Sequence, residues 1–555
     1  MRGAGSFALI FVLIGMCAMC SVDMHPNVAW ADDIPAPESP LDDVGELAAA
    51  INASVSAQWS SEGITPAPAC DNVEFLRRTY LNLVGRIPSV SETRGFLADE
   101  SPGKRRVLVD RLLESPIFVA NLTNIYRTLM LPEADADFQI RFLVPGFEAW
   151  LRDKLIDETP YDQMVRELVT YTLTGNDRTG PSAFYRAKQL KPENLAAGTT
   201  RLFLGVRLEC AQCHDHPFAK WRQDEFWSFA AFYAGFGDQQ TGQMAEDPRI
   251  RRIAVPETER VVAAKFLGGD EPEWTPRSFP RNVLADWLTS PENPYFARAA
   301  ANRIWAHMMG RGLVDPVDDF DESNPPSHPK LLDELASQFV AHDFDIKFLF
   351  RAIAASKPYQ LSSRQTHDSQ ADARLFSRMT VKGLSPDQLF DSLAQATGFY
   401  ENTEFSSRSA AMRNDGSMRS RFRELFRNEN SDATESQTTI LQALALMNGT
   451  FVGSQTDPVQ SSTLSAVIAS PFLDLPGKVE TLFLASLNRE PTSDELKNML
   501  AHIEQYESAS AEEKSDDEPA RALLPASAGR PDSQAAALGD IFWALLNSNE
   551  FLVNH

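Results

Sequence analysis

The sequence predicts a mainly α-helical protein of two domains, and three observations support this. Apolar residues recur at helical spacing along most of the chain. Several of these segments open with a Ser or Thr followed three residues later by Glu or Gln, a pattern typical of helix N-termini. Residues 238–280 instead combine β-branched alternation with Gly and Pro. We therefore expect two helical domains joined by a short β and Pro/Gly-rich segment.

The first helical domain is predicted over 44–237. It follows a flexible leader at 32–43 that is rich in Pro and acidic residues. Ser89 and Glu92 form a capping box that begins one helix. Periodicity and intervening prolines predict the other helices at 73–84, 104–113, 147–156, 161–173 and 194–206.

The linker at 238–280 is predicted to contain a short strand or hairpin within 251–266. The second helical domain is predicted over 281–555. Within it, 508–534 is rich in Ser, Ala, Glu, Asp and Pro, which predicts a disordered insertion. Helices are expected at 281–288, 296–309 and 535–552, and after capping boxes at Ser385 and Thr492.

The N-terminus has the features of a signal peptide over residues 1–31. Arg2 precedes an apolar run, Phe7 to Met19, that is too short to span a bilayer comfortably, and Ala29-Trp30-Ala31 offers a cleavage site. An uncleaved N-terminal anchor is the alternative. No later stretch is apolar enough for a membrane helix. We expect an exported protein, periplasmic or extracellular, with no integral membrane span in the mature chain.

Composition narrows the classes of partner. The 555 residues are 43% hydrophobic and carry a formal net charge of −24, which disfavours nucleic acid and anionic membranes as partners and is compatible with a basic redox partner protein. Five cysteines are too few for a disulfide scaffold. Loss of the signal peptide leaves Cys70, Cys210 and Cys213, which cannot all pair within one chain. The role of Cys70 stays open.

The segment Cys210-Ala211-Gln212-Cys213-His214 has the Cys-x-x-Cys-His (CxxCH) spacing at which c-type haem is attached. Cys210 and Cys213 are the expected thioether anchors, and His214 is the expected ligand of the haem iron. An aromatic stretch at 218–236 either walls the haem or packs in the core. The sixth iron position is open or is filled by one of Met244, His307, Met308, Met309 and His328.

Two other interpretations of the motif remain. A metal ion, zinc, copper or iron, is an alternative cofactor, bound by the compact set Cys210, Cys213, His214 and His216. A plain structural role, including a disulfide between the two cysteines of the motif, is the other.

A second candidate site lies early in the second domain, where polar side chains of varied chemistry gather within a short span. Carboxylates and imidazoles in such a group bind a hard metal or act in acid–base chemistry. The structural alternative is that Arg303 and Arg311 form ion pairs with Asp318 and Asp319 and so fix the conformation of the loop. The candidate residues are Arg303, His307, Asp318, Asp319 and His328.

Long segments of the chain carry a family resemblance. The first region contains FLRRTYLNLVGRIPS at 75–89 and FLGVRLECAQCHDHPFAKW at 203–221. The second contains a long block at 290–336, YQLSSR at 359–364, LSPDQLFDSLAQATG at 384–398, LQALALMNG at 441–449 and FWALLNSNEFLVNH at 542–555. These segments resemble planctomycete secreted two-domain proteins, a cytochrome-like domain followed by a domain of unknown function. The resemblance implies no established activity, and its cytochrome label rests largely on the CxxCH motif.

These observations predict an exported c-type haem-binding protein that serves extracytoplasmic electron transfer or redox chemistry with a partner protein. One alternative is a metal-dependent enzyme acting on an extracytoplasmic polymer such as polysaccharide. The other is a structural or binding scaffold with a non-haem CxxCH. The sequence leaves open whether the protein is an enzyme.

Overall fold

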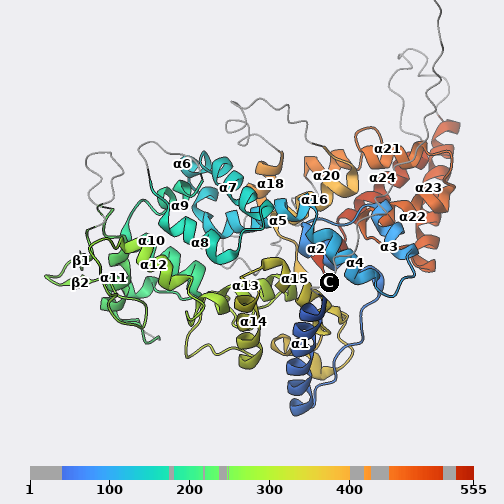
Figure 1. The fold of residues 1–555 in the computed structure, drawn as a ribbon. Helices are drawn as coiled ribbons and strands as arrows, with labels where there is room; N and C mark the ends of the chain where they lie inside the picture. The colour runs from blue at the N-terminus through green and yellow to red at the C-terminus, as the bar shows by residue number, and fades with distance from the viewer. Residues whose placement is uncertain are drawn as a thin grey trace, which may run out of the picture. The chain divides into compact units, whose positions relative to one another are not determined.

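The computed structural model describes residues 41–173, 180–216, 219–236, 247, 249–400, 418–426, 449–516 and 533–555. This part of the chain is mainly helical, as predicted (Figure 1). It also contains two small two-stranded sheets. None of its helices is both long and apolar enough to cross a membrane. The predicted signal peptide at 1–31, most of the leader at 32–43, and Met244 lie outside the described residues.

The helices predicted at 73–84, 104–113, 147–156 and 161–173 are present with their ends shifted by up to three residues, whereas those at 116–130, 138–141 and 182–187 were not predicted. In α2, the Asp71 carboxylate accepts a hydrogen bond of 2.8 Å from the Glu74 amide, which fixes the N-terminus of the helix. The bounds are α1 (Leu41–Glu62), α2 (Asn72–Val84), α3 (Val90–Ala98), α4 (Lys104–Leu113), α5 (Pro116–Met130), α6 (Phe138–Arg141), α7 (Val144–Ile156), α8 (Tyr161–Thr170), α9 (Ser182–Ala187), α10 (Pro192–Thr199) and α11 (Gln223–Ala230).

The expected hairpin within 251–266 is confirmed, since β1 (Arg252–Ala254) pairs antiparallel with β2 (Val261–Ala263). The helices after it are α12 (Pro280–Leu288), α13 (Phe296–Met309), α14 (Pro329–Ala341), α15 (Ile346–Ala355), α16 (Pro386–Thr397), α18 (Met418–Phe426), α20 (Thr450–Gln455), α21 (Ser462–Ala469), α22 (Leu475–Ser486), α23 (Ser493–Asp516), α24 (Ser533–Leu546) and α25 (Asn549–Leu552). A second pair, β3 (Lys382–Gly383) with β4 (Val553–Asn554), was not expected from the sequence.

All three predicted capping boxes are present. In each, the first residue's hydroxyl accepts a hydrogen bond from the backbone amide three residues later, and the side chain of that later residue accepts one in return. The pairs are Ser89 with Glu92, Ser385 with Gln388, and Thr492 with Glu495. Local side-chain chemistry therefore sets these three helix starts.

Three expectations need correction. The helix predicted at 194–206 is α10 followed by one turn of π-helix, Thr200–Leu204, which ends at Gly205. The helix predicted at 535–552 is interrupted, because Ser548 caps a separate α25. The insertion predicted to be disordered at 508–534 is helical as far as Asp516, since its Ala- and Glu-rich start continues α23. Residues 517–532 lie outside the described residues.

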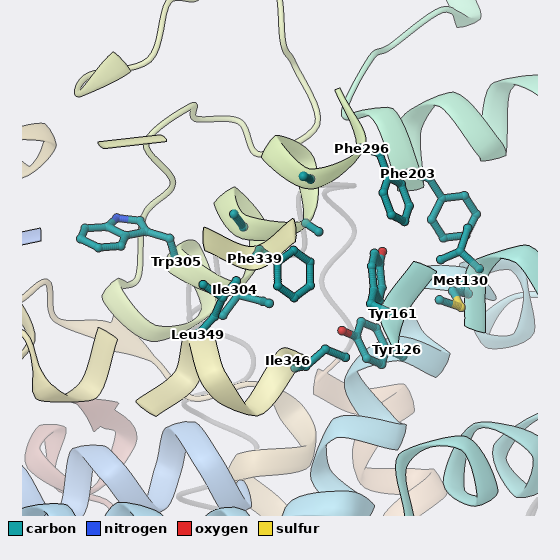
Figure 2. Close-up of a cluster of buried hydrophobic side chains, with 14 of the residues drawn as sticks. Tyr126, Met130, Tyr161, Phe203, Phe296, Ile304, Trp305, Phe339, Ile346 and Leu349 are labelled. Carbon is teal, nitrogen blue, oxygen red and sulfur yellow. The ribbon is translucent and has the colours of Figure 1, made fainter. Parts of the chain in front are cut away.

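The main hydrophobic core does not divide at 238–280. It takes buried residues from Leu47 to Met379, so both predicted domains contribute to it. Figure 2 shows Phe203, from the π-helix, beside Phe296 at the start of α13. Tyr161 of α8 stacks on Phe296 with ring centroids 5.4 Å apart. The two regions of the sequence are therefore packed against each other through large aromatic side chains.

A second core is formed by the C-terminal helices together with part of α2. It contains Leu81 and Ile87 along with residues from Leu384 to Phe551. Helix α3 packs against α22, and Figure 1 shows it beside the C-terminal helices. Helix α2 therefore contributes to both cores, since its Tyr80 lies in the first and its Leu81 in the second.

Candidate functional site

The CxxCH segment follows the π-helix and forms a short turn on the surface. Residues Glu209–Gln212 make one turn of 3₁₀-helix, and Ala211 within it is fully buried. Cys210 and Cys213 are both exposed and are free thiols, so the turn carries no disulfide. His214 is exposed as well. The buried Ala211 fixes the turn to the core, and the three chemically active side chains are left accessible to solvent.

Helix α11 holds this turn in place. The Trp227 indole Nε1 donates to the Gln212 carbonyl at 3.0 Å. The Gln223 side-chain amide donates to the Cys213 carbonyl at 2.9 Å, and the Gln223 backbone amide donates to the Asp215 carboxylate at 3.0 Å. Helix α11 therefore fixes the C-terminal half of the motif, from Gln212 to Asp215, by hydrogen bonds within the protein itself.

The hydrogen bond of His214 determines its tautomer. Its Nδ1 lies 2.7 Å from the Asp215 carbonyl oxygen, which can only accept, so Nδ1 carries the proton. In the neutral imidazole, Nε2 is then the nitrogen with a lone pair for a metal. This arrangement, with the second ring nitrogen bonded to a carbonyl, is the usual one for a metal-ligating histidine. His216 differs, because its Nδ1 accepts a hydrogen bond of 2.8 Å from the Ala219 amide.

The alternative metal set is not assembled. Among the described residues, no three or more His, Cys, Asp or Glu side chains are arranged to hold a metal ion. Cys210, Cys213, His214 and His216 therefore do not form a Cys₂His₂ site in this conformation.

The aromatic stretch after the motif belongs to the core. Phe226, Phe229, Phe232 and Tyr233 are almost fully buried. Phe232 stacks on Phe266, close to the hairpin, with centroids 5.4 Å apart. Trp227 of the same stretch contacts the motif through its hydrogen bond to Gln212. Phe218 lies outside the described residues.

The side chains considered for the sixth iron position are also engaged elsewhere. Met308 and Met309 are buried in α13, and His328 is buried before α14. His307 donates from Nε2 to the Asn82 carbonyl at 2.7 Å, on the side of α13 that faces α2. None of these four side chains is placed to ligate an iron at the exposed motif.

The five residues of the second candidate site do not come together as one group, although two of them, Arg303 and Asp318, line the same cavity. Asp318 pairs with Arg201 through Nε and with Arg207, whose Nη2 lies 2.6 Å from Oδ1. Arg303 donates to the carbonyls of Leu202 and Arg201. The Asp319 carbonyl accepts from Asn324 at 3.0 Å.

His328, the remaining candidate, packs on the Phe376 ring with centroids 5.5 Å apart. The structural alternative had Arg303 and Arg311 pairing with Asp318 and Asp319. Arg311 instead pairs with Asp315 at 2.8 Å.

The neighbouring arginines keep the Asp318 carboxylate ionised. Burial alone would raise the pKa of its carboxyl, but Arg201 and Arg207 outweigh that effect and hold the pKa below its usual value. Asp318 is therefore ionised at neutral pH and does not serve as a general acid. Its two arginines were missed by the sequence analysis, although both lie just before the CxxCH motif, in the segment that delivers it.

Gly205 joins the motif-bearing segment to the loop that carries Asp318. It has φ +67°, and a Cβ placed on it would lie 2.6 Å from Cδ2 of the Phe320 ring. The Phe320 amide donates to the Gly205 carbonyl at 2.8 Å. We expect Gly205→Ala to lower the free energy of unfolding by at least about 1–2 kcal/mol, because it strains the backbone and displaces Phe320. Urea denaturation measures the change.

A matched control is Gly45→Ala. Gly45 lies inside α1, and a Cβ there would meet nothing within 4 Å. That substitution should raise stability by about 0.5–1 kcal/mol, the helix-propensity gain of alanine over glycine. Equal effects of the two substitutions would contradict the role assigned to Gly205.

Each of the two regions of the sequence matches a known protein family. Residues 50–238 match the PSCyt2 family, described as a protein of unknown function (DUF1549). Residues 280–503 match the PSD1 family, also described as a protein of unknown function (DUF1553). The expected tandem order of two uncharacterised domains is thereby confirmed, with the CxxCH turn in the first and Arg303 to Asp319 in the second. No curated protein and no solved structure matches the chain.

Proposed function

We propose that the first of these two matched domains carries one c-type haem on its exposed CxxCH turn, and that the protein passes electrons to a partner outside the cytoplasm. The observation that supports this most directly is the state of the motif. Two free thiols and a histidine with a defined tautomer are exposed on one turn that α11 holds in place.

Each residue of the turn has a part in this proposal. Cys210 and Cys213 would hold the porphyrin by thioether bonds, and His214 would ligate the iron through Nε2. The Asp215 carbonyl, 2.7 Å from Nδ1, orients the imidazole and increases its basicity. When bound, the haem supplies one-electron chemistry. The tether residues need no rearrangement to present their reactive atoms to solvent.

The exposure of the motif favours electron exchange with a protein over chemistry on an enclosed substrate. Cys210, Cys213 and His214 line none of three cavities found in the described part of the chain. A haem tethered to these exposed side chains would be accessible to a partner protein. A basic partner suits the net charge of −24, although charge by itself does not select one.

The test compares wild-type protein with Cys210→Ala/Cys213→Ala, both exported from a host that matures c-type cytochromes. We expect the wild type to gain the mass of one haem and to show a pyridine-haemochrome spectrum, and the double variant to show neither. Cys70→Ala is the matched control, because Cys70 is 4% exposed and should not affect attachment.

An apoprotein mass without a Soret band, in a host whose maturation works on a control cytochrome, would contradict the proposal. Metal analysis of the same sample then separates the remaining alternatives. Stoichiometric zinc, copper or iron would favour the metal-dependent enzyme, and its absence would favour the scaffold.

A further inference from the structure

A cavity of about 500 Å³ lies between the two matched regions. Its walls on one side are the end of α5, α10 and the π-helix, and on the other α13 and the loop that carries Asp318. Glu209, which directly precedes Cys210, also lines it. Its volume is in the range of small-molecule sites, which occur preferentially between domains.

The cavity is lined by equal numbers of basic and acidic side chains. Three are basic, Lys188, Arg201 and Arg303, and three are acidic, Glu133, Glu209 and Asp318. Lys188 pairs with Glu133, and Arg201 pairs with Asp318. A charged ligand would therefore gain little net attraction from the cavity.

One basic and one acidic side chain of the cavity, Arg201 and Glu209, nevertheless keep hydrogen-bonding groups that no group of the described residues uses. Arg201 has five N–H donors and commits Nε to Asp318, while its Nη1 lies 3.8 Å from the Glu209 carboxylate, beyond hydrogen-bond distance. Within the described residues, the Glu209 carboxylate accepts no hydrogen bond. Asn194 donates from Nδ2 to the Lys188 carbonyl at 3.2 Å, which leaves its amide oxygen as an acceptor.

Two irregular stretches of backbone border the same cavity. Arg201 is carried by the π-helix, a form that is rare and often found at functional sites. Gln189 lines the cavity and, with Leu190, has a left-handed conformation, with φ values of 57° and 56°. Consecutive non-glycine residues in that conformation cost energy and tend to persist at binding sites.

We propose that this cavity binds a small, neutral, polyhydroxylated molecule of the sugar class. A hydroxyl group both donates and accepts, so it can bridge the free N–H groups of Arg201 and the Glu209 carboxylate without breaking either ion pair. A cation or anion would have to compete with charges that are already paired. The cavity is complete without haem, so ligand binding does not depend on the function proposed above.

The experiment uses the full mature chain as the Cys210→Ala/Cys213→Ala apoprotein, so that the outcome is independent of haem attachment. Ligand-observed NMR and calorimetry are run with D-glucose, D-galactose, maltose and cellobiose, and with glycine and inorganic phosphate as a zwitterion and an anion. We expect saturable binding of at least one neutral sugar and none of glycine or phosphate.

Three cavity variants locate the site. Glu209→Gln replaces one carboxylate oxygen with an N–H donor and removes the charge, and Asn194→Ala removes the amide oxygen. Each should weaken sugar binding roughly tenfold, the typical effect of losing a hydrogen bond to a charged or well-placed group. Ala197→Trp, which fills the cavity from α10, should abolish binding. Glu322→Gln is the matched control, since its carboxylate is 81% exposed and does not line the cavity.

Thermal unfolding of each variant shows that it is folded. Failure of all four sugars to bind, binding of glycine or phosphate in their place, or equal sugar affinity in the control and in folded Glu209→Gln and Asn194→Ala would each overturn the proposal. If Ala197→Trp does not fold, the two milder variants decide the question.

Discussion

Arg78→Ala is expected to lower the free energy of unfolding by about 3–5 kcal/mol. The Arg78 side chain is fully buried, and its Nη2 lies 2.6 Å from the Glu74 carboxylate. Its Nη1 donates to the Tyr359 carbonyl at 2.5 Å and to the Leu361 carbonyl at 3.0 Å. Its Nε donates to the His555 carbonyl at 3.2 Å. Removing the guanidinium leaves a mostly buried carboxylate without its counter-ion and three carbonyls without this donor, which costs far more than the loss of an exposed ion pair.

Chemical denaturation followed by tryptophan fluorescence measures this effect. Arg78→Lys keeps the charge but not the planar fork of donors, so it should fall between the wild type and Arg78→Ala. The matched control is Arg94→Ala, whose partner Glu480 is 3.4 Å away on the surface, and which should change stability by less than about 1 kcal/mol. A similar small shift for Arg78→Ala and Arg94→Ala would contradict the structural role of Arg78.

The protein is expected to lose stability as the pH falls from 7 towards 4, through two histidines. Burial lowers the pKa of His328 to about 4, with Glu62 opposing the shift. Burial, followed by the charge of Lys382, lowers the pKa of His307 to about 4.

The unfolded chain takes up these protons near pH 6.5, whereas the folded chain resists them. The stabilisation is therefore complete above about pH 6.5 and is lost as pH falls towards 4, by at most about 3 kcal/mol for each histidine. His307 is partly exposed, so its share is the smaller one.

Unfolding midpoints in urea, measured at intervals from pH 7 to pH 4.5, check this expectation. His328→Phe and His307→Gln remove the titrating groups, and the double variant should show a much flatter profile than the wild type. His367→Gln is the control, because His367 is exposed and caps only a short 3₁₀ turn. A wild-type profile that is flat across this range, or an unchanged slope in the double variant, would count against the assignment.

The candidate site shows where sequence reasoning succeeds and where it stops. The motif at 210–214 is recognisable because attachment chemistry depends on local spacing. The sequence suggested Arg303 and Arg311 as ion-pair partners of the aspartates, and for Asp318 this was wrong. Its partners are Arg201 and Arg207, which lie 117 and 111 residues away in the sequence. Nothing in the local pattern distinguishes these arginines from Arg303 and Arg311, which are much closer to Asp318 along the chain.

Helix starts such as those at Ser89, Ser385 and Thr492 follow from the sequence because the groups that make a cap are three residues apart. The apolar period of 3.6 similarly identifies the helices, since it depends on one face of one element. The pairing of β3 with β4, the burial of Arg77 and Arg78, and the shared core across 238–280 depend on contacts between residues far apart in the chain. Such contacts are selected by the packing of whole elements, so only the tertiary structure decides them.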